Sequence, residues 1–519
     1  MLASRRSDYL RDDHKMTDQP WQGDACSLVE AFRRGDHSPT EELQATLDAI
    51  ADSDLNCFAH MHAEQALDKA ASADVAKPFG GVPVGIKELD AVEGWPFTEA
   101  SLVFADRKAE FTATAIQRLF DDGGVVPVGQ TTASEFGGLN VSITKMNGIT
   151  HNAWQKGRTA GGSSAGSAAA VAGGLVSLAS GGDGGGSIRI PAAYNGLVGM
   201  KGTYGRIPRG PHAFIRPNTI VSGCLSRSVR DAARYYDVCA GADPHDPTSI
   251  PSAGNWEGSL GTHDLAGKKV IIDPGLSGVR LDDGVEAATR AAAEQFARDA
   301  GLIIIDHRMD LPRLTAQWMM GNNSTLVADL DDLWPKCRND LTDEIEIGMI
   351  LSQSLYNIRT AAAAEALRVQ ANEVFARAYD EADFIICATN PGPAFAADAT
   401  MSNPEKSFID SAGSSAVMSF TFRRLMWLIR MGGTVAQRMP TRILQWVSDK
   451  YPDVVNMGAL TIAANIYGNP SVSVPIGFLD ELPIGMQIMG RHHEDALVFD
   501  AALAVEREHP WPLTAGARS

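Results

Sequence analysis

Lys87, Ser163 and Ser187 have the side chains and the sequence surroundings that nucleophilic catalysis needs. Lys87 ends an apolar run, and each serine lies in a glycine-rich segment, 158–167 around Ser163 and 181–191 around Ser187. A serine hydroxyl becomes a nucleophile when a neighbouring base takes its proton, and a neutral amine is such a base. Two serines and one lysine can therefore form a hydrolase that needs no histidine.

Three glycines, Gly184, Gly185 and Gly186, stand directly before Ser187. Attack on a carbonyl group needs N–H groups that stabilise the oxyanion, and glycine lets the backbone approach a reacting centre closely. A run of glycines alone is just as typical of a flexible turn. Its place beside a serine, with a second serine loop and Lys87 in the same chain, favours the catalytic interpretation.

Three other catalytic motifs match the chain only in part. The segment 162–166 fits G-x-S-x-G with Ser164 in the middle, but that motif follows a hydrophobic strand and residues 152–160 are not apolar. The segment 142–145 fits S-x-x-K, yet the S-D-N and K-T-G motifs that accompany it are absent. No phosphate-binding G-x-x-x-x-G-K-[ST] loop occurs.

The histidines do not suggest a metal site. The chain has 12 of them, and none pairs with a carboxylate at a convincing ligand spacing. His151 is the closest in sequence to the Ser163 segment, and a surface or supporting role is favoured over a catalytic one. Residues 492–495, His-His-Glu-Asp, fit a polar turn. We expect no metal and no cofactor.

Composition narrows the class of protein further. The 519 residues carry a formal charge of −18, which works against nonspecific binding to nucleic acid. The six cysteines form no C-x-x-C pair, which fits buried thiols in a reducing cytoplasm. No run reaches the roughly 18 apolar residues of a membrane-spanning helix, so no stable insertion into a membrane is expected.

The chain alternates between apolar runs and alanine-rich stretches, which predicts an α/β fold. Ser38 and Pro39 are typical of a helix start, and a helix is expected over 38–50 within a helical region at 27–75. Uninterrupted apolar, often β-branched, runs are typical of strands buried on both faces of a sheet. Such runs occupy 124–129, 269–273, 302–305 and 384–387.

Residues 401–456 break this alternation. They are apolar with interspersed arginines, and they include Phe420 and Trp427. A basic apolar helix can lie on a membrane or a partner, but a packed helix with arginines at its rim is favoured because the whole chain is acidic. We expect a helical insertion that covers the mouth of the active site.

The motifs around the three reacting residues together resemble the amidase signature family. The family's lysine follows G-x-P-x-x-I-K, matched by 81–87, and its first serine lies in G-G-S-S-G-G-S, matched by 161–167. Its nucleophile lies in D-x-G-G-S-I-R-x-P, matched by 183–191. The pattern runs from residue 27 to residue 505 and is loose over 205–460. Shorter matches occupy 135–137, 201–206, 468–475 and 482–487.

Four residues depart from the family's pattern without touching a reacting group. Ala165 replaces a glycine, Glu88 an aspartate, Gly202 a proline and Asn469 a leucine. These changes indicate a divergent branch and weaken any assignment of a substrate by analogy.

The resemblance implies a role for each residue of the site. Ser187 would be the nucleophile, Ser163, preceded by a cis peptide bond, would relay protons, and Lys87 would be the base. The N–H groups of Gly184, Gly185, Gly186 and Ser187 would form the oxyanion hole. Asp183 and Arg189 would pair to support the loop.

The resemblance also implies the architecture, a mixed central β-sheet covered by helices on both faces. We expect one domain over 27–505 that includes the insertion at 401–456. Residues 1–26 are expected to be a flexible extension, and 506–519 a C-terminal tail.

The resemblance implies an amidohydrolase that cleaves a carbon–nitrogen bond of a small-molecule amide, with an anilide, a carbamate or an ester as further substrates. One alternative is the catalytic component of an aminoacyl-tRNA amidotransferase, and another is an esterase or urethanase of the same family. The sequence leaves a homodimer open. A substrate pocket is expected at Phe136, Gly137, Trp318 and Met319, although each of these also fits a protein core.

Overall fold

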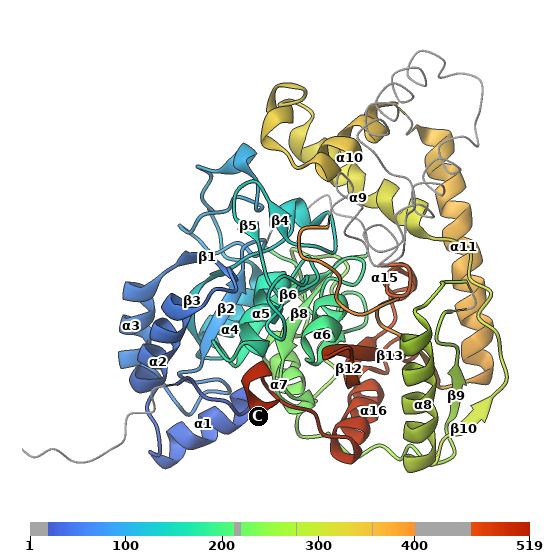
Figure 1. Cartoon of the computed structure of the whole chain (residues 1–519), viewed down its shortest axis with the longest axis horizontal. Helices are drawn as coiled ribbons and strands as arrows, with labels where there is room; N and C mark the ends of the chain where they lie inside the picture. Colours follow the sequence, from blue (N-terminus) through green and yellow to red (C-terminus); the bar gives the residue numbers. More distant parts are fainter. Residues whose placement is uncertain (1–18, 212–218, 277, 355–356, 400–457, 519) are drawn as a thin grey trace, which may run out of the picture.

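The fold is built on two adjoining β-sheets, as the computed structural model in Figure 1 shows. The structure describes every residue except 1–18, 212–218, 277, 355–356, 400–457 and 519. The first sheet has the order β1 (Phe58–Met61), β3 (Val126–Thr131), β2 (Pro83–Lys87), β6 (Leu178–Asp183), β8 (Val221–Ser226). The second has the order β10 (Ile303–Ile305), β9 (Lys269–Ile272), β11 (Phe384–Ala388), β13 (Leu482–Met489), β12 (Ser471–Leu479), β7 (Gly199–Lys201).

Both sheets mix parallel and antiparallel pairs. Strand β2 runs parallel to β3 and β6, whereas β1 and β8 lie antiparallel at the two edges. In the second sheet β9 runs parallel to β10 and β11, and the β11–β13, β13–β12 and β12–β7 pairs are antiparallel. A bridge between Val198 and Ser226 joins the sheets where β7 approaches β8. The predicted α/β fold with a mixed sheet is confirmed.

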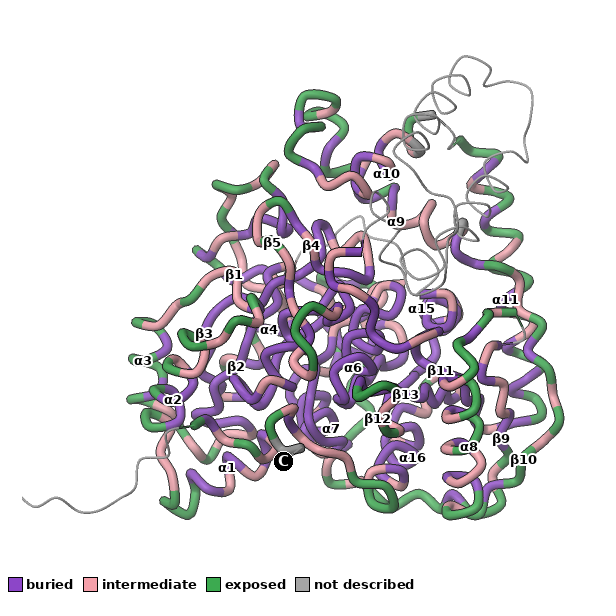
Figure 2. Tube along the Cα trace, in the orientation of Figure 1, coloured by how far each residue is buried: buried purple, intermediate pink, exposed green. Residues whose placement is uncertain are grey.

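Helices cover the sheets on both sides (Figure 1). Figure 2 shows that the strands and the helices between them are largely buried, while the outer helices expose one side. A small two-stranded sheet, β4 (Ile143–Thr144) with β5 (Gly148–Ile149), lies apart. The described α-helices are α1 (Ala25–Arg34), α2 (Pro39–Asp52), α3 (Ala63–Ala71), α4 (Thr114–Asp121), α5 (Ala165–Ala172), α6 (Arg189–Asn195), α7 (Val229–Cys239), α8 (Asp283–Asp299), α9 (Thr315–Leu330), α10 (Asp343–Ser354), α11 (Ile358–Glu381), α15 (Ile462–Tyr467) and α16 (Asp495–Glu508).

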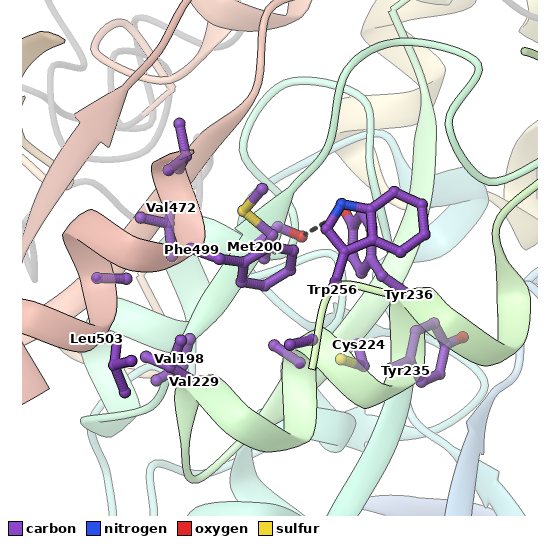
Figure 3. Packing of buried hydrophobic residues seen from close by; sticks show 14 of the residues in the cluster. Val198, Met200, Cys224, Val229, Tyr235, Tyr236, Trp256, Val472, Phe499 and Leu503 are labelled. Carbon is purple, nitrogen blue, oxygen red and sulfur yellow. Dashed lines mark hydrogen bonds between the residues drawn. The ribbon is translucent and has the colours of Figure 1, made fainter. Parts of the chain in front are cut away.

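The main core packs α7 and α16 against β7, β8 and β12. Figure 3 shows Phe499 and Tyr236 close to Met200, and the Tyr236 hydroxyl donates to the Met200 carbonyl at 3.4 Å. The rings of Tyr236 and Phe499 meet edge to face with centroids 5.3 Å apart, an arrangement that aromatic pairs favour. This packing holds the two sheets together.

Several local predictions hold and two fail. Helix α2 begins as expected, because Ser38 and Glu41 form a reciprocal cap at its N-terminus. The expectation that 27–75 is helical throughout is wrong, since β1 lies within it. The run at 302–305 does form strand β10, but β10 is an edge strand, so Ile303 and Ile304 stay 50% and 49% exposed.

Hydrogen bonds tie residues near both ends of the chain to the fold. Helix α1 begins at Ala25, and buried Arg227 donates to the carbonyls of Trp21 and Gly23, so the packed chain starts inside the expected extension 1–26. At the other end Trp511 donates to the carbonyl of Arg227, which ties the expected tail to the fold. The insertion expected at 401–456 lies outside the described residues, and the division into one domain stays a prediction. None of the described helices combines the length and the apolar character needed to cross a membrane.

Candidate active site

Lys87 is the last residue of β2, flanked by the parallel strands β3 and β6. Its backbone N–H donates to the Ser180 hydroxyl at 2.9 Å, which fixes the end of the strand. The side chain is 2% exposed, and its Nζ lies 2.8 Å from Ser163 Oγ and 2.9 Å from Ser164 Oγ. The ammonium group thus meets two hydroxyls and makes no ion pair within the described part of the chain.

Burial lowers the pKa of Lys87 to about 8, because removal from water disfavours the charged form. The negative charges of Asp90 and Asp183 act in the opposite direction but do not cancel the effect. At pH 7 about a tenth of Lys87 is therefore neutral, far more than for a lysine with an ordinary pKa. A neutral amine beside a hydroxyl can accept its proton.

Ser163 lies in the turn before α5, and the Gly162–Ser163 peptide bond is cis, as the resemblance implies. The Ser163 carbonyl accepts from the Ser134 N–H at 3.3 Å. A Cβ atom at position 162 would lie 2.7 Å from Ser134 Oγ and from the backbone N of Val141. Only glycine fits at position 162, so the glycine-rich sequence is needed to bring Ser163 Oγ into contact with Lys87 Nζ.

Ser187 lies in the connection between β6 and α6, with its side chain 4% exposed. Its carbonyl accepts from the Ser164 N–H at 3.3 Å, which joins the two serine loops. The preceding Gly186 has a φ of +125°, and a Cβ there would lie 2.2 Å from the Thr461 hydroxyl. Both the conformation and the contact require glycine at this position.

The N–H and carbonyl groups of the glycine run point in definite directions. The Gly186 N–H donates to Asp183 Oδ1 at 2.7 Å, which removes it from the expected oxyanion hole. The Gly184 carbonyl accepts from Trp318 Nε1 at 2.7 Å, and the Gly185 carbonyl accepts from the Thr461 hydroxyl at 2.6 Å.

The remaining N–H groups of this run, those of Gly184, Gly185 and Ser187, donate to no group in the described part of the chain. They are the groups that remain for an oxyanion.

Asp183 and Arg189 form a fully buried ion pair below this loop. Arg189 Nε donates to Asp183 Oδ2 and Nη2 donates to Oδ1, both at 2.9 Å. Asn465 and Gln487 satisfy the outer donors of the guanidinium group. Burial alone would raise the pKa of Asp183, but the adjacent Arg189 charge holds it well below its usual range. The pair therefore stays ionised and anchors both ends of the loop.

Lys87, Ser163 and Ser187 line one cavity of about 130 Å³. Phe136, Gly137 and Trp318 of the expected pocket line the same cavity, while Met319 on the same helix does not. Figure 1 shows α9, which carries Trp318, above the strands that carry the rest of the site. Phe420 and Trp427 of the expected insertion lie outside the described residues.

A comparison with protein families decides the class of this chain. The family model described as "Amidase" matches residues 41–422 and 434–499. The chain belongs to the amidase signature family. It is a hydrolase of that family, acting on carbon–nitrogen bonds.

Curated relatives with one shared name match this family member over nearly its whole length. The A-subunit of the glutamyl-tRNA(Gln) amidotransferase of Lacticaseibacillus paracasei is 28% identical, over 93% of this chain and 96% of its own. The protein of the same name from Chromohalobacter salexigens is 29% identical, over 94% and 96%.

Solved structures of amidase signature enzymes share the fold. A bacterial aryl acylamidase superposes with a TM-score of 0.81 at 25% identity, covering 96% of this chain and 98% of its own. A 6-aminohexanoate cyclic dimer hydrolase superposes with a TM-score of 0.77 at 24% identity, over 96% and 99%. The second likeness concerns the fold alone.

Some contacts of this amidase-family site are not evident from its motifs. The sequence indicates Ser164 only as the centre of another motif, yet its hydroxyl contacts Lys87. Thr461 and Asn465 bind the nucleophile loop from a part of the chain more than 270 residues away. Their only sequence signal is a place shortly before the match at 468–475. Within the described ranges, no group of histidine, cysteine and acidic side chains has the arrangement of a metal site.

Proposed function

We propose that this chain is an amidase that cleaves the carbon–nitrogen bond of a small-molecule amide through an acyl-enzyme on Ser187. The observation that carries the proposal is the 2.8 Å contact between Lys87 Nζ and Ser163 Oγ in the cavity that Ser187 also lines. Burial of Lys87 without an ion pair among the described residues supplies the neutral amine that the chemistry requires.

In the first half of the reaction Lys87 takes the proton of Ser163, and Ser163 takes the proton of Ser187. Ser187 Oγ then attacks the amide carbon, and the carbonyl oxygen becomes an oxyanion. The N–H groups of Gly184, Gly185 and Ser187 stabilise this oxyanion without reorganisation, because their loop is already held by its carbonyls.

In the second half the proton returns to the nitrogen of the leaving group. Lys87 gives it to Ser163, and Ser163 gives it to the nitrogen, so the C–N bond breaks and the amine leaves uncharged. A water molecule then attacks the acyl-enzyme with Lys87 and Ser163 again taking the proton. The acid is released, and Ser187 regains its hydroxyl group.

The names of the relatives support two further substrates. The amidotransferase relatives favour glutamine, whose ammonia would pass to a partner protein. The aryl acylamidase favours an anilide. An ester or a carbamate would pass through the same acyl-enzyme, so an esterase or urethanase activity uses the same residues.

Hydrolysis of a small substrate panel by the purified chain tests the proposal. The panel contains glutamine, an aliphatic amide, an anilide, a carbamate and an ester, and each is assayed beside the Ser187→Ala variant. We expect at least one amide to be cleaved by the wild type and a loss of about 10³-fold or more in the variant. Equal activity of both proteins would remove Ser187 from the nucleophile position.

A further inference from the structure

Arg209 lines the same cavity as Ser187, among walls that are mostly apolar. It lies in the loop that follows the K-G-T-Y-G-R segment, and this loop is held in place at two points. The Arg209 N–H donates to Asp246 Oδ2 at 3.0 Å, and the Gly210 carbonyl accepts from the Thr114 N–H at 2.9 Å. The half-buried side chain is therefore presented by a backbone that is bonded on both sides.

The guanidinium group of Arg209 has almost no partner within the described part of the protein. Its one hydrogen bond, from Nη2 to the Tyr204 hydroxyl, is 3.3 Å long, and its Cζ lies 5.9 Å from the centre of the same ring. A guanidinium group carries five N–H donors. Arg206 in the same loop pairs with Asp495 at 3.0 Å, whereas no described carboxylate forms such a pair with Arg209.

The carboxylates of the neighbouring segments accept hydrogen bonds from other groups, although the charge of Arg209 also acts on Asp246. Asp246 accepts from the N–H and hydroxyl groups of Thr248 at 3.0 and 2.6 Å. Asp90, which also lines the cavity, accepts from the Ser180 hydroxyl at 2.7 Å. Since Ser180 accepts from the Lys87 N–H, the Asp90 carboxylate belongs to the network around the base. The cavity thus offers a positive group most of whose donors are not used by the described residues.

The apolar part of the cavity lining is suited to a carbon chain or a ring. Phe97, Phe111 and Ile116 contribute apolar surface to the cavity, and Ile116 belongs to the first turn of α4. The polar lining residues of α9 use their groups within the helix, because Asn322 donates to the Trp318 carbonyl and Thr325 to the Asn322 carbonyl.

We propose that Arg209 binds a carboxylate of the substrate, so that this enzyme prefers amides that carry an anionic group away from the scissile bond. The inference rests on the proposed function and names its substrate class. A guanidinium group binds a carboxylate through two parallel hydrogen bonds, and the apolar walls bury the carbon chain between the two polar ends. A substrate without the carboxylate leaves the guanidinium group unpaired in a partly dry cavity, which disfavours binding.

Matched pairs of anilides test the preference. The anionic members are the N-phenyl half-amides of succinic, glutaric and adipic acids, and their uncharged counterparts are the anilides of butanoic, pentanoic and hexanoic acids. A further pair, 4-acetamidobenzoate and acetanilide, places the carboxylate on the leaving amine. The anilide of 5-aminopentanoic acid provides a cationic control.

We expect the wild type to prefer at least one anionic member over its counterpart by tenfold or more in kcat/KM. Arg209→Met should lower this preference at least tenfold, and Arg209→Lys should keep most of it. A preference for the neutral or cationic members would overturn the inference. So would an equal loss on both members of a pair in Arg209→Met, because that result indicates a structural role.

A binding measurement separates this inference from the proposed function. Calorimetric titration of the Ser187→Ala variant with the same pairs needs no turnover. Tighter binding of an anionic member by tenfold or more, lost in the Ser187→Ala, Arg209→Met double variant, supports the carboxylate site even if the wild type cleaves none of the anilides. Equal binding of both members overturns it even if the wild type cleaves them all.

Discussion

Two buried cations flank the nucleophile loop, and their surroundings differ in one respect. Arg189 lies below the loop with Asp183 at 2.9 Å, so each charge has a partner. Lys87 Nζ lies at 2.8 and 2.9 Å from two hydroxyls, and Lys87 makes no ion pair among the described residues. Burial is nearly complete for both side chains.

Equal burial therefore has opposite consequences for protonation. The carboxylate partner keeps the Arg189 region ionised, since the pKa of Asp183 stays well below its usual range. The hydroxyl partners leave desolvation dominant at Lys87, whose pKa falls to about 8. An ion pair that holds a loop needs fixed charges, whereas a base must be able to exchange its proton. A carboxylate partner favours the first, and hydroxyl partners favour the second.

A third buried cation shows that a lowered pKa alone does not identify the base. Burial, followed by the Arg189 charge, lowers the pKa of Lys201 to about 7. Its Nζ donates to the Gly202 carbonyl at 3.1 Å, and the residue does not line the cavity. Among the lysines that the structure describes, only Lys87 combines a lowered pKa with contact to a hydroxyl in the cavity.

Replacing Lys87 should have the largest effect on activity. Lys87→Met keeps the apolar length and removes the base, so we expect kcat/KM to fall by about 10³-fold or more. The loss should appear with each cleaved amide, measured as initial rates of product release. Ser164→Ala removes the contact of Lys87 with Ser164 but keeps its contact with Ser163. In this variant we expect kcat/KM to fall about tenfold. Equal losses in the two variants would contradict the assignment of Ser163 as the relay.

Breaking the Asp183–Arg189 pair should act mainly on stability. Arg189→Met leaves the buried Asp183 carboxylate without its counter-charge, which costs about 3–5 kcal/mol in the free energy of unfolding. Denaturant titration followed by circular dichroism measures this change. Lys87→Met should change the free energy of unfolding far less, because it strands no buried charge.

The double variant Asp183→Asn, Arg189→Met provides the control for that experiment. It removes both charges, and the asparagine oxygen can still accept from the Gly186 N–H. We expect it to recover part of the lost stability. A double variant as unstable as the single one would mean that Arg189 acts through its contacts with Asn465 and Gln487 instead.

The same comparison predicts the direction of the pH dependence. Protonation inactivates a basic lysine, so kcat/KM should rise by about tenfold per pH unit below the pKa of Lys87, about 8, and level off above it. Initial rates from pH 5.5 to 10 with a substrate whose chemical step is slow provide the profile.

Lys201→Met is the matched control for the pH profile. Its pKa, about 7, lies close enough to confuse the assignment. The midpoint should stay near 8 in this variant. If the midpoint of the pH profile shifts in Lys201→Met, or if the profile is flat, Lys87 is not the base.

The sequence motifs indicated residues that the structure brings together, but not the residues that hold them in place. Motifs at 81–87, 161–167 and 183–191 contain Lys87, Ser163 and Ser187, which line one cavity. Thr461 and Asn465 were not predicted, because hydrogen bonds between segments far apart in the chain leave no local sequence pattern.

Strand β10 shows the same limit for the fold. The sequence predicted the strand but not its place at the sheet edge, which depends on the pairing of distant segments. The expected N–H donor at Gly186 failed for a related reason. The Asp183 carboxylate accepts a hydrogen bond from the Gly186 N–H only in the folded loop.

Trp318 offers the finest test of how the nucleophile loop is held between the two cations. Its Nε1 donates to the Gly184 carbonyl. A Cβ atom at position 185 would lie only 2.6 Å from the Trp318 ring, so the ring packs directly against Gly185. Trp318→Phe keeps a ring but removes the donor, which frees the Gly184–Gly185 peptide to rotate. We expect kcat to fall about tenfold with little change in KM, the value of one lost neutral hydrogen bond that matters in the transition state.

Inhibition by two substrate analogues distinguishes a role of Trp318 in positioning the loop from a simple loss of pocket surface. An aldehyde analogue of the substrate forms a tetrahedral adduct with Ser187 and places its oxyanion on the loop, whereas the product acid only occupies the cavity. Trp318→Phe should weaken inhibition by the aldehyde about tenfold and inhibition by the acid hardly at all. If both inhibitors weaken equally, Trp318 is a wall of the pocket, and the loop owes its orientation to Asp183 and Thr461 instead.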